Sequence, residues 1–373
     1  MTVTDDTTDT SKKFAFRNMS SPEAGAPPEA TLRWGIIGCG DVCERKSGPA
    51  LCTAQRSRLV AVMRRDAAKA ADFARRHGAP RSYSTVEGLL GDSEVNAVYV
   101  ASPPRHHCEH ALAALAAGHK VVLVEKPFGM DEGECRAVVA AAEAAGARVY
   151  VAYYRRFYPK WQAAKALLAA GCIGQVLGAR LQMCSEAAAS GWRVDPALSA
   201  GGHFVDVGSH RIDMLLYLLG ATPVRVHGFA RNELGHHGAE NDVAFTMLLS
   251  SGALVTGSFH YHTPPQRDVL ELFGSRGTMT FDPWDGTDFS VCTSAGARTT
   301  HSHPTPSPVH LPFVQELVWH ALGARPGDPE QRASPVLDAG LRADHVHGGQ
   351  GTLATQVIDA VLGPVRERVR ATS

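Results

Sequence analysis

The chain has 373 residues, enough for about two domains of the usual size. Its 37 lysines and arginines balance 37 aspartates and glutamates, so no excess charge attracts nucleic acid or an acidic membrane. With 44% hydrophobic and 20% charged residues the composition is that of an ordinary globular protein, and no apolar run approaches the ~20 residues of a membrane helix. The eight cysteines form no Cys-x-x-Cys pair, which favours reduced thiols in a cytoplasmic protein over disulfides or a zinc site.

The first half of the chain alternates short apolar runs with helical patterns. Residues 1–30 are rich in Thr, Ser, Asp and Pro and are predicted to form a disordered leader. The apolar runs that follow cover 34–37, 59–63, 97–101, 121–124 and 149–153, and the helical patterns cover 67–77, 106–117 and 131–145. Continuous apolar strands that alternate with helices indicate a parallel sheet with both faces buried. We therefore predict a doubly wound Rossmann domain over residues 31–153.

The second half has a different rhythm. Strand patterns without intervening helices cover 175–185, 224–230, 242–249, 253–261, 269–273 and 278–281. The other expected elements are a helix over 204–219, a proline-rich loop over 299–312 and a C-terminal helix over 351–369. The fold class is thus α/β, with residues 154–373 forming an α+β domain on a large, mostly antiparallel open sheet. Such a sheet exposes one broad face, which predicts a homodimer or homotetramer formed through it.

A glycine-rich turn follows the first strand directly. Gly38 permits the tight turn, and Gly40 lets backbone N–H groups approach a pyrophosphate at the start of the next helix. Asp41 and Val42 continue this turn. Cys43 stands where Gly or Ala is usual, which should loosen the packing of helix on strand slightly. Because the turn joins a strand to a helix within an alternating α/β pattern, we predict dinucleotide binding here.

The end of the second strand indicates which dinucleotide. An NAD site usually places an acidic residue there to hold the ribose 2′-hydroxyl. This chain has Arg64 and Arg65, whose planar guanidiniums suit the 2′-phosphate of NADP(H), followed by Asp66, which we expect to cap the next helix. NADP(H) is thus the preferred cofactor, and NAD(H), held through Asp66, is the alternative.

Two further segments carry groups suited to acid–base chemistry. Lys126 precedes Pro127 at the end of a strand, an edge that faces the cofactor crevice in this fold. Asp206 and His210 stand four residues apart, so on a helix they share one face and can touch. Removing hydride from a secondary alcohol needs a proton acceptor, for which an imidazole suits neutral pH, while an ammonium stabilises the charge on oxygen. From these residues alone, either Lys126 or His210 can be the immediate proton donor of the reverse reaction.

With these segments the sequence resembles the glucose–fructose oxidoreductase/inositol dehydrogenase/MocA family, from Leu32 to Phe281. The matching pieces, beside the glycine turn, are Ala101-Ser102-Pro103-Pro104 with His107, Glu125-Lys126-Pro127, Arg155-Arg156-Phe157 with Pro159, Gly171-Cys172-Ile173-Gly174, Trp192-Arg193, Asp206 with His210 and Asp213, and Phe273-Gly274-Ser275-Arg276-Gly277-Thr278. Their order and spacing together make the resemblance specific. The departures are Cys43 in the glycine turn and His203, which stands where a third glycine is common.

The resemblance implies a role for each matching position. Lys126 corresponds to a lysine that contacts the nicotinamide ribose and the reacting oxygen, His210 to the residue that passes the proton, and Asp206 to the carboxylate that orients it. The cofactor-binding residues expected from the turns and the resemblance are Gly38, Gly40, Asp41, Val42, Arg64, Arg65, Ser102, Pro104, His107, Glu125, Lys126, Pro127, Arg156, Trp192 and Arg193.

We therefore expect an NADP(H)-dependent oxidoreductase acting on a polyhydroxylated small molecule, namely a sugar, ketosugar or cyclitol, without nucleic-acid or membrane partners. Two other functions are compatible with the sequence: an NAD-dependent glycosidase of the same family, and a non-catalytic protein that senses a dinucleotide.

The segment His106–His110 is dense in metal-ligand residue types. Because His107 in it matches a family position, we predict no metal there.

Overall fold

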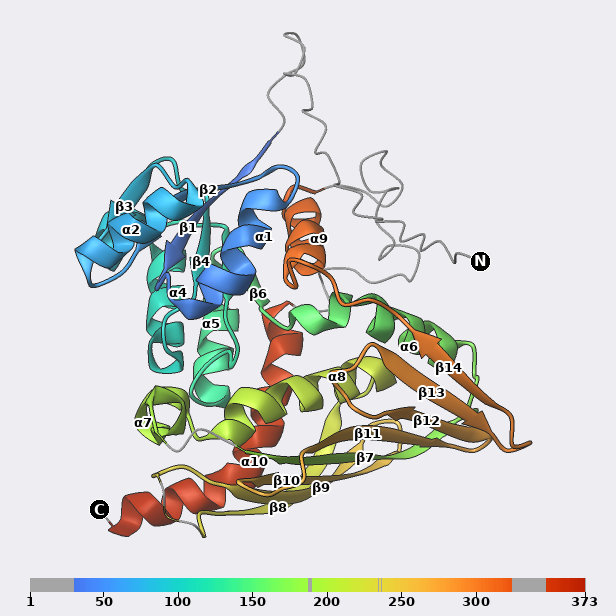
Figure 1. Ribbon diagram of the computed structural model, residues 1–373. Coiled ribbons are helices and arrows are strands. Elements are labelled where there is room, and N and C mark those ends of the chain that lie inside the picture. The colour runs from blue at the N-terminus through green and yellow to red at the C-terminus, as the bar shows by residue number, and fades with distance from the viewer. Residues whose placement is uncertain (1–29, 187–189, 234, 236, 324–346, 373) are drawn as a thin grey trace, which may run out of the picture. The chain divides into compact units, whose positions relative to one another are not determined.

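The computed structural model describes residues 30–186, 190–233, 235, 237–323 and 347–372, with side chains up to 363 in the last range. The leader predicted over residues 1–30 lies outside the described residues except for Ala30. From Thr31 onward the chain builds two separate sheets, one in each half of the sequence (Figure 1).

The first sheet has six parallel strands in the order β3-β2-β1-β4-β5-β6. They are β1 (Leu32–Ile37), β2 (Ser57–Met63), β3 (Arg81–Tyr83), β4 (Ala97–Val100), β5 (Val121–Val124) and β6 (Arg148–Val151). Every residue of β4 and β5 is buried, as expected for strands covered on both faces. The strand order confirms the doubly wound fold and places its topological switch point between β1 and β4.

Helices connect these strands, and short turns precede two of them. They are η1 (Cys43–Ser47), α1 (Gly48–Thr53), α2 (Ala67–His77), α3 (Val86–Leu90), η2 (Pro104–His106), α4 (His107–Ala116) and α5 (Glu132–Ala144). The bounds of α2 match the prediction because both ends carry strong signals. The Asp66 side chain accepts a hydrogen bond from the Lys69 amide at 3.1 Å, and Gly78 ends the helix with a φ of 70°.

The second sheet has eight strands in the order β14-β13-β12-β11-β7-β10-β9-β8. They are β7 (Val176–Ser185), β8 (Pro223–Arg231), β9 (Asp242–Leu249), β10 (Leu254–Tyr261), β11 (Arg267–Gly274), β12 (Gly277–Phe281), β13 (Asp288–Thr293) and β14 (Arg298–Ser302). All neighbours are antiparallel except β7 and β10. On the inner face Phe259 meets Phe204 with ring centroids 5.1 Å apart, and a Cβ added at Gly257 would lie 2.2 Å from the Phe245 ring. Close packing of aromatic rings therefore fixes this face.

The remaining helical elements follow the first sheet in the sequence, and two of them, η3 and α6, connect it to the second sheet. They are η3 (Tyr154–Phe157), α6 (Pro159–Ala169), η4 (Trp192–Val194), α7 (Pro196–Ser199), η5 (Phe204–Gly208), α8 (Ser209–Leu219), α9 (Leu311–Ala321) and α10 (Gly348–Thr372). Late in the chain, α9 contacts α1 and η3, while α10 contacts α5, β6 and β8 (Figure 1). Because these late helices pack against the first half, the domain boundary at residue 153 stays a prediction.

The structure contains elements that the sequence did not predict, including the helices α3, α6 and α9 and the strands β3, β13 and β14. The strand β3 was not predicted, since it has only three residues and none is buried. Part of the expected loop over 299–312 is the edge strand β14, whose residues are all polar, and its last two residues begin α9. The helix expected from residue 204 begins instead as the π-helical turn η5.

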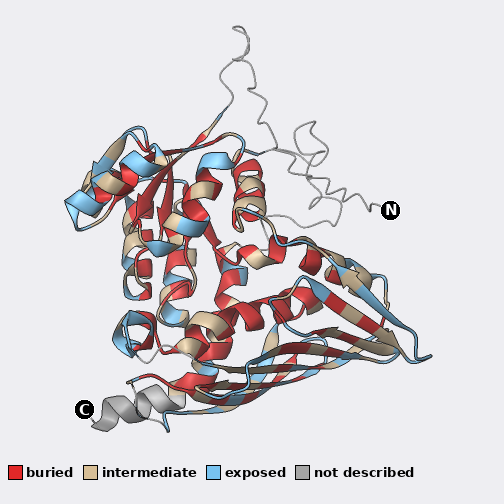
Figure 2. Cartoon of the chain, viewed as in Figure 1, coloured by how far each residue is buried: buried red, intermediate tan, exposed pale blue. Residues whose placement is uncertain are grey.

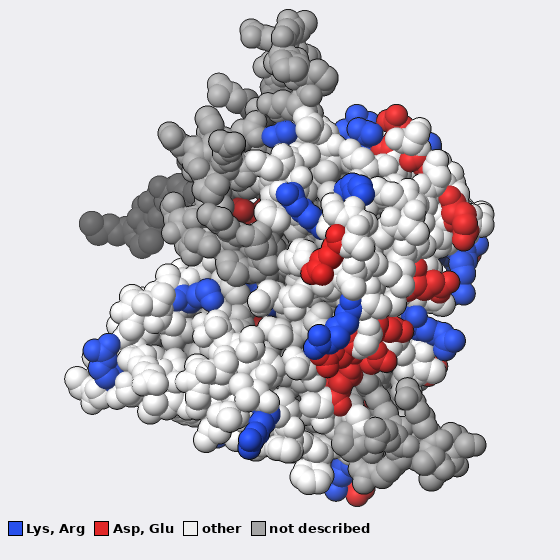
Figure 3. Space-filling view, turned by 180° about the vertical axis from the view of Figure 1, so that it is seen from behind, with Lys and Arg blue, Asp and Glu red and all other residues white. Residues whose placement is uncertain are grey.

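The second sheet is buried on one face and exposed on the other (Figure 2). Large apolar side chains lie on the exposed face, with Phe229 on β8 84% accessible and Leu254 on β10 65% accessible. Seen from behind, charged groups of both signs mix on the side of the first sheet and are sparse on the side of the second (Figure 3). None of the described helices combines the length and hydrophobicity needed to cross a membrane.

Candidate active site

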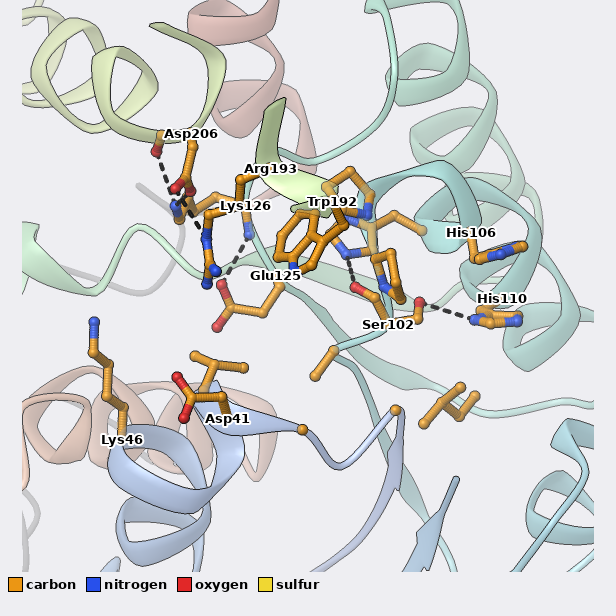
Figure 4. Close-up of a pocket in the computed structure, with 18 of the residues that line it drawn as sticks. Asp41, Lys46, Ser102, His106, His110, Glu125, Lys126, Trp192, Arg193 and Asp206 are labelled. Carbon is orange, nitrogen blue, oxygen red and sulfur yellow. Dashed lines mark hydrogen bonds and ion pairs between the residues drawn. The ribbon is translucent and has the colours of Figure 1, made fainter. Parts of the chain in front are cut away.

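A cavity of about 970 Å³ lies at the carboxyl ends of β1, β2, β4 and β5 and reaches to η5 and α8. The carboxyl edge of a parallel sheet is where doubly wound folds bind ligands. Most of the site residues predicted from the sequence line this cavity, namely Gly38, Gly40, Asp41, Val42, Arg64, Arg65, Ser102, Pro104, His107, Glu125, Lys126, Trp192, Arg193, Asp206 and His210. The structure therefore brings residues from both halves of the chain to one site (Figure 4).

The glycine turn has the geometry of a phosphate cradle. Gly38 has a φ of +88°, and a Cβ there would lie 2.7 Å from the Ser102 backbone, so only glycine fits. At Gly40 a Cβ would meet no atom closer than 3.8 Å, which leaves the approach to the backbone open. Cys43 is fully buried in η1, and its thiol points to the Gly38 carbonyl at 4.0 Å. The cysteine thus fills space beneath the turn without blocking it.

At the end of β2, Asp66 and the two neighbouring arginines make different contacts. Asp66 is committed to its helix, since it caps α2 and forms an ion pair with Lys69 at 3.2 Å. Arg64 and Arg65 line the cavity, and neither forms an ion pair with another described residue. Arg64 donates only a long hydrogen bond, at 3.4 Å, to the Cys39 carbonyl. Two guanidiniums without an ion-pair partner among the described residues and one carboxylate that already has partners therefore border the cavity here.

His107 connects the ends of two strands at this cavity. Its ring nitrogens lie 2.7 Å from the carbonyl oxygens of Ser102 and Pro127. Pro127 is not among the residues that line the cavity, and its carbonyl contacts His107, so the cofactor contact expected at this residue stays a prediction. The Lys126–Pro127 peptide bond is cis.

Two further histidines stand side by side at the same end of the cavity. The rings of His106 and His110 stack with centroids 5.5 Å apart, and His110 Nδ1 lies 3.0 Å from the Ser102 hydroxyl (Figure 4). The potential ligand atoms of His106, Glu109 and His110 all lie within 4.8 Å of one another. The absence of a metal at this cluster therefore stays a prediction.

The ammonium of Lys126 is held by Asp206 across the cavity. Nζ donates to the Asp206 carbonyl at 2.8 Å and to its carboxylate oxygen Oδ1, while Arg193 Nε lies 3.4 Å from the other oxygen, Oδ2 (Figure 4). Burial alone would raise the pKa of Asp206, but the charge and hydrogen bond of Lys126 lower it below the usual value. The Asp206 carboxylate is thus ionised at neutral pH, and its contact with Lys126 connects the end of β5 to η5.

His210 is buried and has no hydrogen bond to Asp206, which corrects the contact expected from their four-residue spacing. Residues 204–208 form a π-helical turn, whose i to i+5 bonds break the usual i, i+4 alignment of side chains. The His210 ring instead packs edge-on against Tyr153 and Tyr154, with centroids 6.0 and 5.5 Å away. Burial, followed by the charges of Lys126 and Arg155, lowers the pKa of His210 well below 6.5.

Arg156 is also placed differently from the expectation. Its side chain is 3% exposed and forms a two-pronged ion pair with Asp213, with Nε donating at 3.0 Å, so it is not part of the cavity lining. The neighbouring Arg155 lines the cavity instead and pairs with Asp285. Which of two adjacent arginines faces a ligand depends on the turn η3, and their sequence carries no sign of it.

Several residues that line the cavity were not expected from the sequence. Lys46 on η1, Tyr154, Asp285 and His310 all contribute to the lining. Lys46 has a weak signal, since it lies on the turn after the glycine loop and points into the same crevice (Figure 4). His310 has none: it precedes α9 and is brought in by the packing of α9 on η3.

Comparison with known proteins places this site in a family context. Residues 32–153 match the family model described as an oxidoreductase family with an NAD-binding Rossmann fold, and residues 161–280 match the C-terminal domain model of the same family. Oxidoreductase P35 from Formosa agariphila is 32% identical over 302 residues, which cover 79% of this chain and 92% of that protein. The 1,5-anhydro-D-fructose reductase of Ensifer adhaerens is 29% identical over 66% of this chain and 74% of its own length.

Solved structures share the fold at lower identity. The aldose-aldose oxidoreductase of Caulobacter crescentus, solved with glycerol, superposes with a TM-score of 0.75 at 23% identity, covering 90% of this chain and 98% of that one. Other structures with the same fold, at TM-scores from 0.71 to 0.75, were solved with NAD, NADP or NADH.

Proposed function

This chain belongs to the glucose–fructose oxidoreductase/inositol dehydrogenase/MocA family of oxidoreductases, and from that premise we propose that it transfers hydride between NADP(H) and a sugar, ketosugar or cyclitol. The reacting group is a carbonyl in one direction and a secondary alcohol in the other. Relatives named for a sugar reductase and an aldose-aldose oxidoreductase support a polyhydroxylated substrate.

The observation that carries this proposal is the Lys126–Asp206 pair at the carboxyl edge of the first sheet. Two of the three ammonium protons of Lys126 are taken up by the carbonyl and the carboxylate of Asp206. The third remains for an oxygen of a molecule in the cavity. A donor held in this way, on a side chain only 15% exposed, stabilises negative charge that develops on a reacting oxygen.

The dinucleotide fits the residues that line the cavity. Gly38 and Gly40 leave room for a pyrophosphate at the first turn of the following helix, where amide N–H groups have no carbonyl partner within the helix. When bound, the nicotinamide supplies or accepts the hydride. The chain supplies the proton: in reduction Lys126 gives one to the new alkoxide-like oxygen, and in oxidation it accepts one. His210, uncharged at neutral pH, holds a substrate hydroxyl by hydrogen bonding.

The preference for NADP(H) over NAD(H) is supported by the end of β2. Arg64 and Arg65 have no ion-pair partner among the described residues, so both forks can bind the oxygens of a 2′-phosphate. The nearby carboxylate of Asp66 already accepts from the Lys69 amide and pairs with the Lys69 ammonium, which favours the arginines over Asp66 as the partners of the ribose. A cytoplasmic location agrees with eight free cysteines. Assembly through the outer face of the second sheet agrees with the exposed Phe229 and Leu254.

The test is an NADPH-oxidation screen against ketosugars and dicarbonyl compounds, followed by Lys126→Met. We expect at least one ketosugar to be reduced, and the variant to lose about two or more orders of magnitude in kcat. Lys120→Met removes a lysine that donates to the Ala145 carbonyl at 2.6 Å and does not belong to the cavity lining, and it should keep full activity. Turnover that survives Lys126→Met would contradict the proposal. Cofactor that co-purifies and is regenerated in each cycle would point to the glycosidase instead.

A further inference from the structure

A second cavity, of about 170 Å³, opens beside the first and shares four of its lining residues. The shared residues are Lys46, Tyr154, Arg155 and Asp285. Tyr154 borders both spaces, and its ring contacts two residues of the main cavity, His210 at 5.5 Å and His310 at 4.0 Å between centroids. A molecule that reacts near Lys126 can therefore place a remote group in this side cavity.

The charges around the side cavity favour an anion. Three cations, Lys46, Arg155 and Lys160, face one carboxylate, Asp285. Asp285 is already paired with Arg155, whereas Lys46 forms no ion pair with any described residue. Its Nζ lies 5.8 Å from the centroid of the Tyr154 ring. The ammonium of Lys46 is thus the cation left for a ligand.

Buried hydrogen-bond donors among the lining residues also favour an anionic ligand. Arg155 Nε and Trp284 Nε1 are buried and have no acceptor among the described residues. Lys160, which is 4% exposed, donates to the carbonyls of Trp284 and Gly286 and keeps a third proton. Buried donors without acceptors are rare in folded proteins, so a site that gathers them calls for a ligand rich in acceptor oxygens.

These cations are not explained by the dinucleotide alone. The glycine turn, residues 38–42, lines the main cavity and contributes nothing to the described lining of the side cavity. Arg64 and Arg65 lie at the opposite end, on β2. Lys46 is the one described residue of the segment after the glycine turn that borders both spaces.

We propose that the side cavity binds an anionic group of the substrate, a carboxylate or a phosphate, held by Lys46 with the buried donors of Arg155, Lys160 and Trp284. The substrate class is then an acidic sugar derivative, a sugar acid or a sugar phosphate, in place of a neutral sugar. This inference rests on the proposed oxidoreductase function of the main cavity, because the reacting carbon must lie beside Lys126.

The experiment measures binding by calorimetry to the full chain saturated with NADP⁺, so it does not depend on turnover. The probes are D-glucose, D-glucuronate, D-glucose 6-phosphate and inorganic phosphate. We expect at least one of the two charged sugars to bind about tenfold more tightly than glucose, and the tighter of the two identifies carboxylate or phosphate. Lys46→Met should remove this preference, and Lys46→Glu should reverse it. Lys120→Met, which removes the same charge elsewhere, should preserve it.

Several results would overturn the inference. Equal affinities for glucose and both charged sugars would do so, as would failure of all charged probes, phosphate included, to bind the unaltered protein. A preference that survives Lys46→Met while NADP⁺ affinity falls about tenfold would assign Lys46 to the cofactor. If charged sugars bind through Lys46 and yet no NADPH is oxidised with any substrate, the anion site stands and the proposed oxidoreductase reaction fails. If neutral ketosugars are reduced and charged sugars are not preferred, the oxidoreductase reaction stands and the proposed anion site fails.

Discussion

The partner of Asp206 can be identified by a double-mutant cycle. Asp206 contacts Lys126 and not His210, so its contribution to catalysis should pass through the lysine. We expect Lys126→Met to lower kcat by about 10²- to 10⁴-fold, the scale for loss of a general acid. Asp206→Asn alone should cost about ten- to a hundredfold, and in the Lys126→Met background it should cost almost nothing more.

The size of this coupling follows from the burial of the pair. The side chains of Lys126 and Asp206 are 15% and 24% exposed, between a surface ion pair and a fully buried one. Surface pairs contribute about 0–1 kcal/mol and breaking fully buried pairs costs about 3–5 kcal/mol. A coupling energy of about 1–3 kcal/mol is therefore expected between the two substitutions, within the range for residues in contact. Asp206→Asn and His210→Ala should instead be additive.

The assay is steady-state NADPH oxidation with the best substrate of the screen, with thermal unfolding to show that each variant folds. Asp72→Asn serves as a matched control, because it removes an exposed carboxylate paired with Arg76 on α2. Strong coupling of Asp206 with His210, together with additivity of Asp206 and Lys126, would refute the reasoning.

The pH dependence of kcat/KM provides a second test of the roles of Asp206 and His210. The lowered pKa of Asp206 keeps its carboxylate ionised down to acidic pH, and the lowered pKa of His210 keeps its ring uncharged over the same range. Neither group changes charge near pH 6.5, so kcat/KM should show no inflection there. An inflection near pH 6.5 that disappears in His210→Ala would show that the histidine titrates during catalysis.

Three further outcomes are expected. Replacing both Arg64 and Arg65 by Ala should weaken NADP⁺ binding by about ten- to a hundredfold and NAD⁺ binding far less, measured by fluorescence titration; equal losses would remove the 2′-phosphate role. Phe229→Asp should lower the molar mass found by light scattering, because it places a charge on the exposed face of the second sheet, and an unchanged mass argues against assembly through that face. Asp213→Asn should lower the free energy of unfolding by about 3–5 kcal/mol in urea, since the buried Arg156 loses the charge of its carboxylate partner; a loss below about 1 kcal/mol would contradict this.

The first sheet could be predicted from the sequence because its physical signals are local. Strands such as β4 and β5 are buried throughout and appear as uninterrupted apolar runs. The bounds of α2 follow from a capping aspartate and a terminal glycine. The strand β14 lacks such a signal, since it is a polar edge strand beside a proline-rich segment, and its pairing with β13 depends on the rest of the sheet.

Some residues of the site could likewise be predicted from local sequence, whereas contacts between distant residues could not. Residues at strand ends, such as Lys126, reach the cavity because every parallel strand ends at the same edge. The contact of Lys126 with Asp206 joins residues 80 positions apart, and nothing local indicates it. The spacing of Asp206 and His210 suggested the wrong partner because a π-helical turn changes the helical repeat, and such a turn has no clear sequence signature.

The distribution of charge in the main cavity also supports the proposal that Lys126, rather than either histidine, transfers the proton. Burial and the neighbouring cations lower the pKa of His310 to about 3, and similar causes act on His210. An imidazolium at either position would add positive charge next to Lys126 without a carboxylate of its own. Lys126 already faces Asp206, whose second oxygen is 3.4 Å from Arg193. When Lys126 gives up its proton, Arg193 still balances the Asp206 carboxylate, so the transfer leaves no isolated charge in the cavity.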